Sequence, residues 1–376
     1  MIERTLQKAI QKQLFTGKII IIYGARQVGK TTLVKEIIKQ SSKQSKYIDC
    51  DLLENREVLS SQSLSKIKSF LGDYELVVID EAQRVKNIGI NLKIINTHLP
   101  QMQVVATGSS SFDLANKISE PLTGRAFDYM LLPFSLGEIR QKIDKLEIAE
   151  NLENLLTFGS YPEVFGQDHE RAEKILNNIS SNYLYKDILE FERLKKPDQL
   201  LRILQLLALQ AGGEISFSEI GSQIGLNTVT VQKYVDLLEK TFVIFRLHGF
   251  SRNIRKEITK SHKIYFWDLG IRNSLIRNFN TLNLRQDLGA LWENFCILER
   301  IKSNLFCQRF VNTYFWRNYY GQEIDYLEEK DGLLSAFEFK WSEKKKARAP
   351  KAFLDTYPNS QFQVINRENF LDFIIT

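Results

Sequence analysis

The amino-acid sequence predicts an α/β protein of several domains. The first observation is that apolar β-type runs alternate with segments of helical periodicity up to residue 134, which favours a parallel sheet. The second is that helical periodicity then dominates residues 135–262. The third is that the remaining residues combine a long apolar helix with two strands of alternating polarity. We therefore predict four parts, with boundaries at residues 1–134, 135–199, 200–262 and 263–376.

The composition is that of an ordinary globular protein. Apolar residues make up 43% of the chain and charged residues 26%, which excludes the disordered and fibrous classes. No apolar run approaches the ~20 residues that cross a bilayer, and the polar start MIERTLQKAIQKQ lacks the apolar core of a signal peptide. We therefore expect no membrane association and place the protein in the cytoplasm.

The cysteines and the net charge exclude few classes of function. Cys50, Cys296 and Cys307 are scattered and odd in number, so they indicate neither a disulfide framework nor a zinc site. We expect each to be a small buried apolar residue. The net charge of +6 permits a polyanionic partner without requiring one.

A glycine-rich stretch near the N-terminus carries the strongest motif. An apolar strand from Lys18 to Tyr23 leads into Gly24-x4-Gly29-Lys30-Thr31, and a helical pattern follows. This is a complete P-loop in the strand-loop-helix context that the motif requires. Its amides would surround the phosphates of ATP, its lysine would contact them, and its threonine would bind Mg²⁺. The candidate nucleotide-binding residues are Gly24, Ala25, Arg26, Gln27, Val28, Gly29, Lys30, Thr31 and Thr32.

A second apolar strand, Leu76–Ile79, ends in an acidic pair. A nucleotide hydrolase needs one carboxylate for the metal and one to orient the attacking water, both at the carboxyl end of a parallel strand. We assign the metal role to Asp80 and the water-orienting, catalytic role to Glu81.

A third strand, Gln103–Ala106, delivers the polar run Thr107-Gly108-Ser109-Ser110. These side chains could contact the γ-phosphate of a bound nucleotide or cap the next helix. The sequence does not decide between the two interpretations. Ser109 is the residue that we add to the candidate nucleotide site.

Four stretches together resemble the AAA+ class of P-loop ATPases: GARQVGKTTL, VVIDEAQ, ATGSSS and LTGRAFDYMLLPFSLGE. They are similar to one branch of it, a bacterial and archaeal family in which an N-terminal AAA domain precedes a C-terminal DUF4143 region. The resemblance implies an arginine that brings positive charge to the γ-phosphate, sometimes from a neighbouring subunit of a homo-oligomer. Arg125 is the residue that it suggests, and Arg26 is the second candidate.

The middle of the chain has one sharp break. Gly159 and Pro162 interrupt the helical pattern, so we expect a helical lid over the nucleotide to end there. The stretches GSYPEV and YLYKDILEF also resemble the DUF4143-linked family.

From residue 200 onward, three helical segments and a strand-like run predict a winged helix-turn-helix. Ser218 and Asn227 stand where helix N-caps are expected. The predicted recognition helix offers Lys233 and Lys240 against two acids, so it could bind a protein as well as a DNA groove.

A short stretch after these helices is rich in positive charge. Only Glu257 and Asp268 oppose it. Such a segment could contact DNA phosphates without reading sequence, and the alternative is a solvated loop. The basic residues are Arg246, Arg252, Arg255, Lys256, Lys260, Lys263 and Arg272.

The C-terminal part predicts a hairpin whose polar face carries a charged set. In LLSAFEFKW, alternation separates Glu338 and Lys340 from the aromatic residues, and the upstream strand GQEIDYLEE would bring Asp325 close to them. Before both strands, an apolar helix carries Glu293 on its border. The three acids would suit Mg²⁺ or Mn²⁺, and Lys340 would serve catalysis beside an attacked phosphate.

This helix-strand-strand order resembles the PD-(D/E)xK nuclease superfamily, which has a restriction-endonuclease-like α/β fold. The stretches WENF, FWR, GQEIDY and EFKW are also similar to the DUF4143 tail. Asp325 follows Ile324 rather than the proline that is frequent in the superfamily. The structural alternative is a salt-bridged face on a DNA-binding or oligomerisation module.

Three functions follow from these patterns. The leading hypothesis is an ATP-hydrolysing AAA+ protein whose C-terminal half engages DNA. The second is a nucleotide-dependent switch that recruits a protein and binds no nucleic acid. The third is a metal-dependent nuclease gated by ATP.

Overall fold

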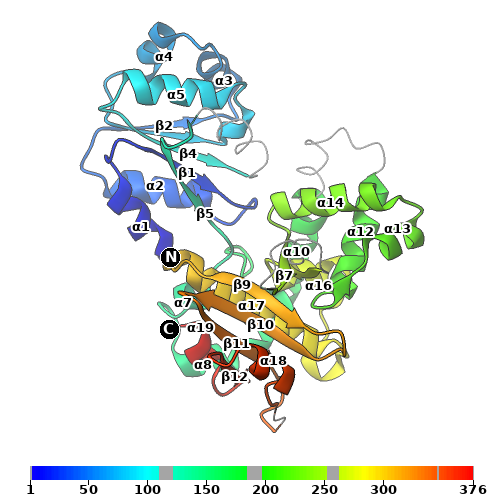
Figure 1. Cartoon of the computed structure of the whole chain (residues 1–376). Coiled ribbons are helices and arrows are strands. Elements are labelled where there is room, and N and C mark those ends of the chain that lie inside the picture. The colour runs from blue at the N-terminus through cyan, green and yellow to red at the C-terminus, as the bar shows by residue number, and fades with distance from the viewer. Residues whose placement is uncertain (1, 110–121, 184–196, 252–261, 345–346, 376) are drawn as a thin grey trace. The chain divides into compact units, whose positions relative to one another are not determined.

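A computed structural model describes residues 2–109, 122–183, 197–251, 262–344 and 347–375 (Figure 1). These form two compact units. The first comprises Met1–Leu132 with Lys240–Phe242, and the second comprises Pro133–Glu239 with Val243–Thr376. The division lies two residues before the predicted boundary at residue 134. Apart from Lys240–Phe242, the three predicted C-terminal parts fall together in the second unit, and the boundaries between them stay predictions.

The first unit contains a five-stranded parallel sheet in the order β2-β3-β4-β1-β5. This confirms the predicted P-loop α/β class. The strands β1, β3 and β4 are buried along their whole length, as their unbroken apolar runs require. The elements are α1 (Thr5–Gln13), β1 (Ile19–Tyr23), α2 (Lys30–Gln40), β2 (Ser45–Asp49), α3 (Leu53–Leu59), α4 (Leu64–Leu71), β3 (Leu76–Asp80), η1 (Ala82–Arg84), α5 (Ile88–His98), β4 (Gln103–Gly108) and β5 (Ala126–Met130).

The strand register places the predicted nucleotide residues at one edge of this sheet. Tyr23 lies beside Gly108, and Ile79 lies beside Ala106. Because all five strands are parallel, the segments that follow β1, β3 and β4 emerge at the same carboxyl edge. The chain therefore brings the phosphate loop, the acidic pair and Ser109 to one edge.

The second unit contains a mixed seven-stranded sheet in the order β12-β11-β10-β9-β7-β8-β6. Helix α17 packs on strands β8 and β11 of this sheet. The elements are α7 (Leu136–Ile139), α8 (Lys145–Glu150), α9 (Leu152–Phe158), α10 (His169–Asn178), η2 (Ile179–Tyr183), α12 (Pro197–Leu209), β6 (Glu214–Ile215), α13 (Phe217–Ile224), α14 (Thr228–Lys240), β7 (Ile244–Gly249), β8 (His262–Phe266), α16 (Leu269–Leu275), η3 (Leu282–Leu284), α17 (Leu288–Phe306), β9 (Asn312–Arg317), β10 (Glu323–Lys330), β11 (Leu333–Phe339), α18 (Lys351–Thr356), β12 (Gln361–Ile365) and α19 (Phe370–Ile374).

One sheet joins the predicted wing to the predicted nuclease-like strands. Strand β7 pairs antiparallel with β8 on one side and parallel with β9 on the other, where His248 lies beside Tyr314. The wing is therefore not a free hairpin but the continuation of the C-terminal sheet.

The predicted helix caps are half right. The Asn227 side chain accepts a hydrogen bond from the Thr230 amide at 2.8 Å, as expected for the N-cap of α14. The N-cap of α13 is Ser216, which accepts from the Glu219 amide at 3.3 Å. The Ser218 prediction is wrong because its hydroxyl lies instead against that of Ser216, at 2.9 Å.

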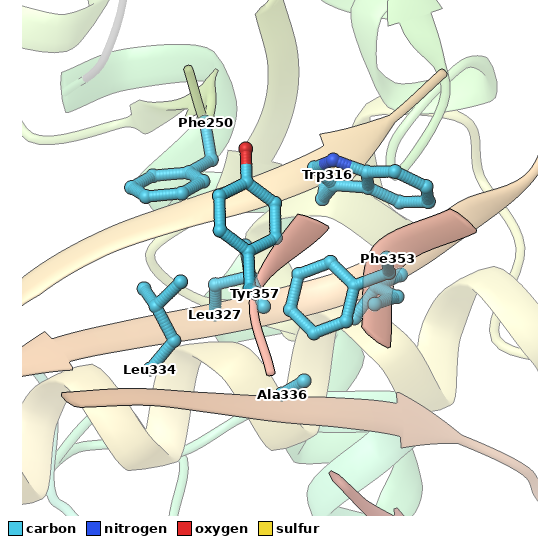
Figure 2. Close-up of a cluster of buried hydrophobic side chains, with 8 residues drawn as sticks. Phe250, Trp316, Leu327, Leu334, Ala336, Phe353 and Tyr357 are labelled. Carbon is cyan, nitrogen blue, oxygen red and sulfur yellow. The ribbon is translucent and has the colours of Figure 1, made fainter. Parts of the chain in front are cut away.

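A hydrophobic cluster, half of it aromatic, forms part of the core of the second unit (Figure 2). Its members come from β9 to β11, from α18 and from the end of β7. The rings of Trp316 and Phe353 meet edge to face at 5.3 Å, and Phe353 contacts Tyr357 at 5.1 Å. The cluster consists of Phe250, Trp316, Ile324, Leu327, Leu334, Ala336, Phe353 and Tyr357.

Two of the three cysteines match the expectation. Cys50 and Cys296 are buried. Cys307 is exposed, because it follows the last turn of α17 and lies outside the packed face of that helix.

Candidate functional site

The phosphate loop lies between β1 and α2, where its backbone requires glycine at two points. Gly29 has φ +97°, a conformation that side chains with a β-carbon disfavour. At Gly24, a β-carbon would lie 2.1 Å from the Leu131 carbonyl oxygen, so any other residue would push the loop away from the segment that follows β5. The two glycines of the motif are therefore needed for the fold of the loop.

Lys30 begins α2 and is 5% exposed. Its ammonium donates hydrogen bonds to the carbonyl oxygens of Gly24 and Ala25, both at 2.8 Å. The lysine thus holds the loop closed from inside, and a phosphate bound by the loop amides would lie within reach of the same ammonium.

Asp80, at the end of β3, is 3% exposed and is surrounded by hydroxyl donors. It accepts hydrogen bonds from Thr31 Oγ1 at 2.7 Å, from Tyr47 Oη at 2.6 Å and from Thr107 Oγ1. Burial, and then the adjacent Asp80, raise the pKa of Tyr47, which keeps this phenol a neutral donor. Thr31 and Asp80 together form an oxygen donor set that fits Mg²⁺.

Glu81 adopts an unusual backbone conformation for a residue with a side chain, with φ +54°. Its amide donates to Thr107 Oγ1 at 3.2 Å. Its carboxylate accepts from the Gln83 side-chain amide, and that amide also donates to Ser109 Oγ at 2.9 Å. Gln83 therefore links the predicted catalytic acid to the predicted serine of the next strand.

Sequence reasoning missed two residues of this site. Gln83 could have been found from its spacing, two residues after Glu81 and just past a strand end. Tyr47 lies on the edge strand β2, and no local pattern distinguishes it from an ordinary strand tyrosine.

Arg125 lies far from the phosphate loop of its own chain. It immediately precedes β5, and its carbonyl oxygen accepts from the Ile19 amide at the start of β1. The five residues of β1 separate that level from the loop, about 16 Å at the usual strand rise. Within one chain its side chain cannot reach the γ-phosphate. Arg26, the second candidate, belongs to the loop itself and is partly exposed.

The second unit brings the four residues of the predicted nuclease-like set together. Strands β10 and β11 pair antiparallel, with Tyr326 beside Phe337, and a bulge in β10 falls between residues 324 and 327. The Asp325 carboxylate accepts from the Phe339 amide at 2.8 Å, and Lys340 pairs with Glu338 at 2.6 Å. We call Glu293, Glu323, Asp325 and Glu338, with Lys263 and Lys340, the acid cluster.

Lys263 was not predicted to belong to this cluster. Its ammonium lies 3.1 Å from Glu293 Oε1 and also forms an ion pair with Glu323. Two residues along the same strand, Tyr265 donates to Glu293 Oε1 at 2.6 Å. The alternation in HKIYF put Lys263 and Tyr265 on one face, but only the structure shows that this face meets α17.

Burial and like charge shape the protonation of the acid cluster. Burial raises the pKa of Glu293, and the adjacent Lys263 partly opposes that shift. Burial also raises the pKa of Asp325 well above its ordinary range, and the negative charges of Glu293 and Glu338 add to the effect. Both effects favour the protonated form of these carboxyl groups. Each ionised carboxylate in the cluster therefore depends on a nearby cation or hydrogen-bond donor.

These carboxylates are not arranged as the ligands of a metal ion. Within the parts of the chain that the structure describes, no three histidine, cysteine or acidic residues are grouped so that they could hold a metal ion. The oxygens face lysines, a phenol and a backbone amide instead. The assignment of a metal to Glu293, Asp325 and Glu338 rests on the sequence pattern alone.

The expected basic wing is not an exposed positive surface in the described residues. Arg246 pairs with Asp236 at 2.6 Å and with Glu239. Arg272 pairs with Asp287, and Lys263 belongs to the acid cluster. Each of these cations is therefore neutralised within the fold. The remaining predicted residues, Arg252, Arg255, Lys256 and Lys260, lie outside the described residues.

Across the described residues, no helix is long and apolar enough to span a bilayer.

Three family models match successive parts of the chain. An AAA domain matches residues 16–140, a domain of unknown function named DUF8612 matches residues 149–282, and a domain of unknown function named DUF4143 matches residues 288–373. The order of the first and last confirms the architecture that the sequence resemblance predicted.

Similar chains occur in bacteria and archaea. An uncharacterized protein of Methanocaldococcus jannaschii is 26% identical over 373 residues, which cover 93% of this chain and 81% of the relative. An uncharacterized protein of Mycobacterium tuberculosis is 25% identical over 334 residues, which cover 88% and 72%. One from Haemophilus influenzae is 24% identical over 295 residues, which cover 73% of each chain.

Two solved structures are distantly similar. One, described as the basis for DNA unwinding at forked double-stranded DNA by two Pif1 helicases, has a TM-score of 0.26 and 16% identity, and covers 48% of this chain and 52% of its own. The other, Drosophila ORC bound to AT-rich DNA and Cdc6, has a TM-score of 0.27 and 8% identity, and covers 73% and 90%. Both scores are low, and the fold assignment rests on the strand order instead.

Proposed function

The chain joins an N-terminal AAA domain to a C-terminal DUF4143 region, and from this premise we propose that it binds and hydrolyses ATP. One observation supports the proposal above the others. Thr31, Asp80 and Glu81 meet at the carboxyl edge of the parallel sheet, beside the loop that Lys30 holds closed. A phosphate-binding loop, a metal-binding pair and a second acid at one edge are what ATP hydrolysis needs.

Each residue has a distinct role in this proposal. The amides of the loop and the Lys30 ammonium bind the phosphates and offset their charge. Thr31 and Asp80 hold Mg²⁺, which supplies further positive charge at the phosphates. Glu81 orients the attacking water and accepts its proton. Gln83 and Ser109 fix the Glu81 carboxylate in position.

Phosphate release and calorimetry test this function together. The purified chain should bind ATP in the presence of Mg²⁺ and release phosphate with turnover. Well-folded protein that binds neither adenine nor guanine nucleotides would contradict the proposal.

Arg125 can contribute to ATP hydrolysis only if the chain forms an oligomer. Because it lies at the amino edge of its own sheet, it can serve an ATP site only in a neighbouring copy of the chain. If it does, Arg125→Ala should lower turnover without lowering ATP affinity, and mixing it with an Asp80→Asn chain should partly restore turnover. Mass photometry with a non-hydrolysable ATP analogue would detect the oligomer.

We further propose that the C-terminal half engages DNA without reading its sequence. Helices α13 and α14 are joined by a short turn, and Thr228, Gln232 and Lys233 of α14 are exposed. Such a helix can contact a groove while nearby cations bind phosphates. DNA affinity should then fall steeply as the salt concentration rises.

A protein-recruiting switch is the second candidate. The pairing of Arg246 and Arg272 with acids of the same fold favours it, because these cations are not available to phosphates. It predicts no salt-dependent DNA binding at any nucleotide state.

A third candidate is an ATP-gated nuclease that uses Mg²⁺ or Mn²⁺, favoured by the Asp325 carboxylate lying against the amide of Phe339, the residue that follows Glu338. Supercoiled plasmid incubated with Mn²⁺ tests it, with Glu338→Ala and Lys340→Ala as matched variants. A wild-type protein no more active than these variants would eliminate it.

A further inference from the structure

We propose that the ammonium group of Lys263 takes the place of a divalent cation in the acid cluster, so that this nuclease-like site is neutralised by the protein itself. The inference concerns the second unit alone and does not depend on ATP hydrolysis.

The position of Lys263 is set by the sheet. Strand β8 pairs with β7 on one side and β6 on the other, where Lys263 lies beside Leu247 and Glu214. A strand held on both sides cannot slide, and its side-chain alternation points Lys263 and Tyr265 to the same face. The lysine is 2% exposed, so its charge must be compensated inside the protein.

Two acids from two elements pair with this ammonium. Glu293 of α17 lies 3.1 Å away, and Glu323 of β10 forms an ion pair with it. Asp325 follows two residues later on β10. Buried carboxylates brought together by a helix and a strand would attract a divalent cation. Here the lysine nitrogen lies against them instead, and among the described residues no three acids are left grouped to hold a metal.

Each carboxylate of the acid cluster already has a donor. Glu293 accepts from Lys263 and Tyr265. Asp325 accepts from the Phe339 amide, and Glu338 pairs with Lys340. Glu323 pairs with Lys263 and lies 3.7 Å from Arg317. A metal ion would have to displace these donors before it could bind.

The test is Mn²⁺ binding by the whole chain, measured from the electron paramagnetic resonance signal of free Mn²⁺. Every protein in the series carries Asp80→Asn, which removes the candidate metal ligand of the nucleotide site and keeps the shape of the side chain. Without nucleotide, this parent should bind no Mn²⁺ at the acid cluster. Adding Lys263→Ala removes the ammonium and opens space, so we expect one bound Mn²⁺ per chain under conditions in which the parent binds none. Adding Glu293→Gln as well should abolish the gain.

Stability supplies a second measurement. Lys263→Met keeps an unbranched side chain only one atom shorter and removes its charge, which leaves buried carboxylates without their cation. We expect the melting temperature to fall by about 5 °C or more, and Lys263→Met with Glu293→Gln to recover part of that loss.

Two results would overturn the proposal. One is stoichiometric Mn²⁺ binding by the parent that Glu293→Gln abolishes, because the lysine would then not exclude a metal. This measurement needs no Lys263 variant, so it decides the matter even if Lys263→Ala fails to fold. The other is a Lys263→Met protein as stable as the wild type, because the lysine would then not be the counter-ion of the acids.

Discussion

The two acidic sites of this chain surround their carboxylates with different partners. Asp80 in the first unit accepts from three hydroxyl groups, those of Thr31, Tyr47 and Thr107. Glu293 and Glu338 in the second unit each pair with a lysine. A hydroxyl is neutral and can turn to make room for a cation, whereas an ammonium must be displaced against its own attraction to the acid. The chemical type of the donors, more than the number of acids, indicates which site can accept a metal.

Lys30→Ala is the change with the largest expected effect on this comparison. It removes the ammonium that holds the phosphate loop, so we expect turnover to fall about 1,000-fold and ATP binding to be lost. Calorimetry and phosphate release measure the two effects. Lys43→Ala, an exposed lysine of the same unit that pairs with Glu75, should leave both unchanged. Substantial turnover in Lys30→Ala would place nucleotide chemistry elsewhere in the chain.

Glu81→Gln separates metal binding from water activation within the first site. Asp80 and Thr31 are untouched, so ATP binding should persist while turnover falls about 100-fold. A single-turnover assay would show retained, unhydrolysed ATP. The matched control is Glu75→Gln, a partly exposed glutamate of the same unit. Normal turnover in Glu81→Gln would remove Glu81 from its catalytic role.

Local patterns in the sequence were enough to place the phosphate loop and the acidic pair of the first site together. The spacing from Gly24 to Thr31 and the acids after an apolar strand each lie within ten consecutive residues. The parallel sheet then brings them to one edge, as parallel strands must. Arg125 shows the limit of this reasoning. Its distance from the loop depends on β5 pairing parallel with β1, and no local motif specifies that pairing.

The second site was predicted only in part, because it depends on contacts between distant segments. The turn at Asp331-Gly332, where both residues have positive φ, and the alternation of the flanking strands identify the hairpin from sequence. The place of Lys263 depends instead on the parallel pairing of β7 with β9, which inserts the predicted wing into the C-terminal sheet. From the sequence alone, Lys263 was predicted to be one of several cations in a basic loop.

Asp268 is a third kind of buried acid in this chain, because backbone amides donate to its carboxylate. It accepts from the amides of Ser160 at 2.8 Å and Ile271 at 3.1 Å. Burial nevertheless raises its pKa from 3.8 to about 6. Because the folded protein binds this proton more tightly than the unfolded chain, Asp268 stabilises the fold most below pH 4, and that contribution is lost as the pH rises to about 6.

The Asp268→Asn variant isolates this contribution. The free energy of unfolding of the wild type should fall between pH 4 and 6 by an amount on the order of 3 kcal/mol that the variant does not show. Urea unfolding at several pH values measures the difference. Asp355→Asn, an exposed aspartate on α18, should follow the wild-type profile. Parallel profiles for Asp268→Asn and the wild type would mean that Asp268 keeps its ordinary pKa.

Gln83→Ala has the smallest expected effect. It tests how much a neutral hydrogen-bond donor contributes to the first site. The Gln83 amide donates to both Glu81 and Ser109, so its loss frees the Glu81 carboxylate, the proposed catalytic group, without changing any charge. We expect turnover to fall about tenfold while ATP affinity stays the same, because the phosphate loop and Asp80 are untouched. Steady-state kinetics separates the two quantities, and Gln44→Ala, an exposed glutamine of the same unit, is the control. Turnover that rises would show that Gln83 holds Glu81 away from the water instead of toward it, and neutral donors would then restrain the first site much as lysines restrain the second.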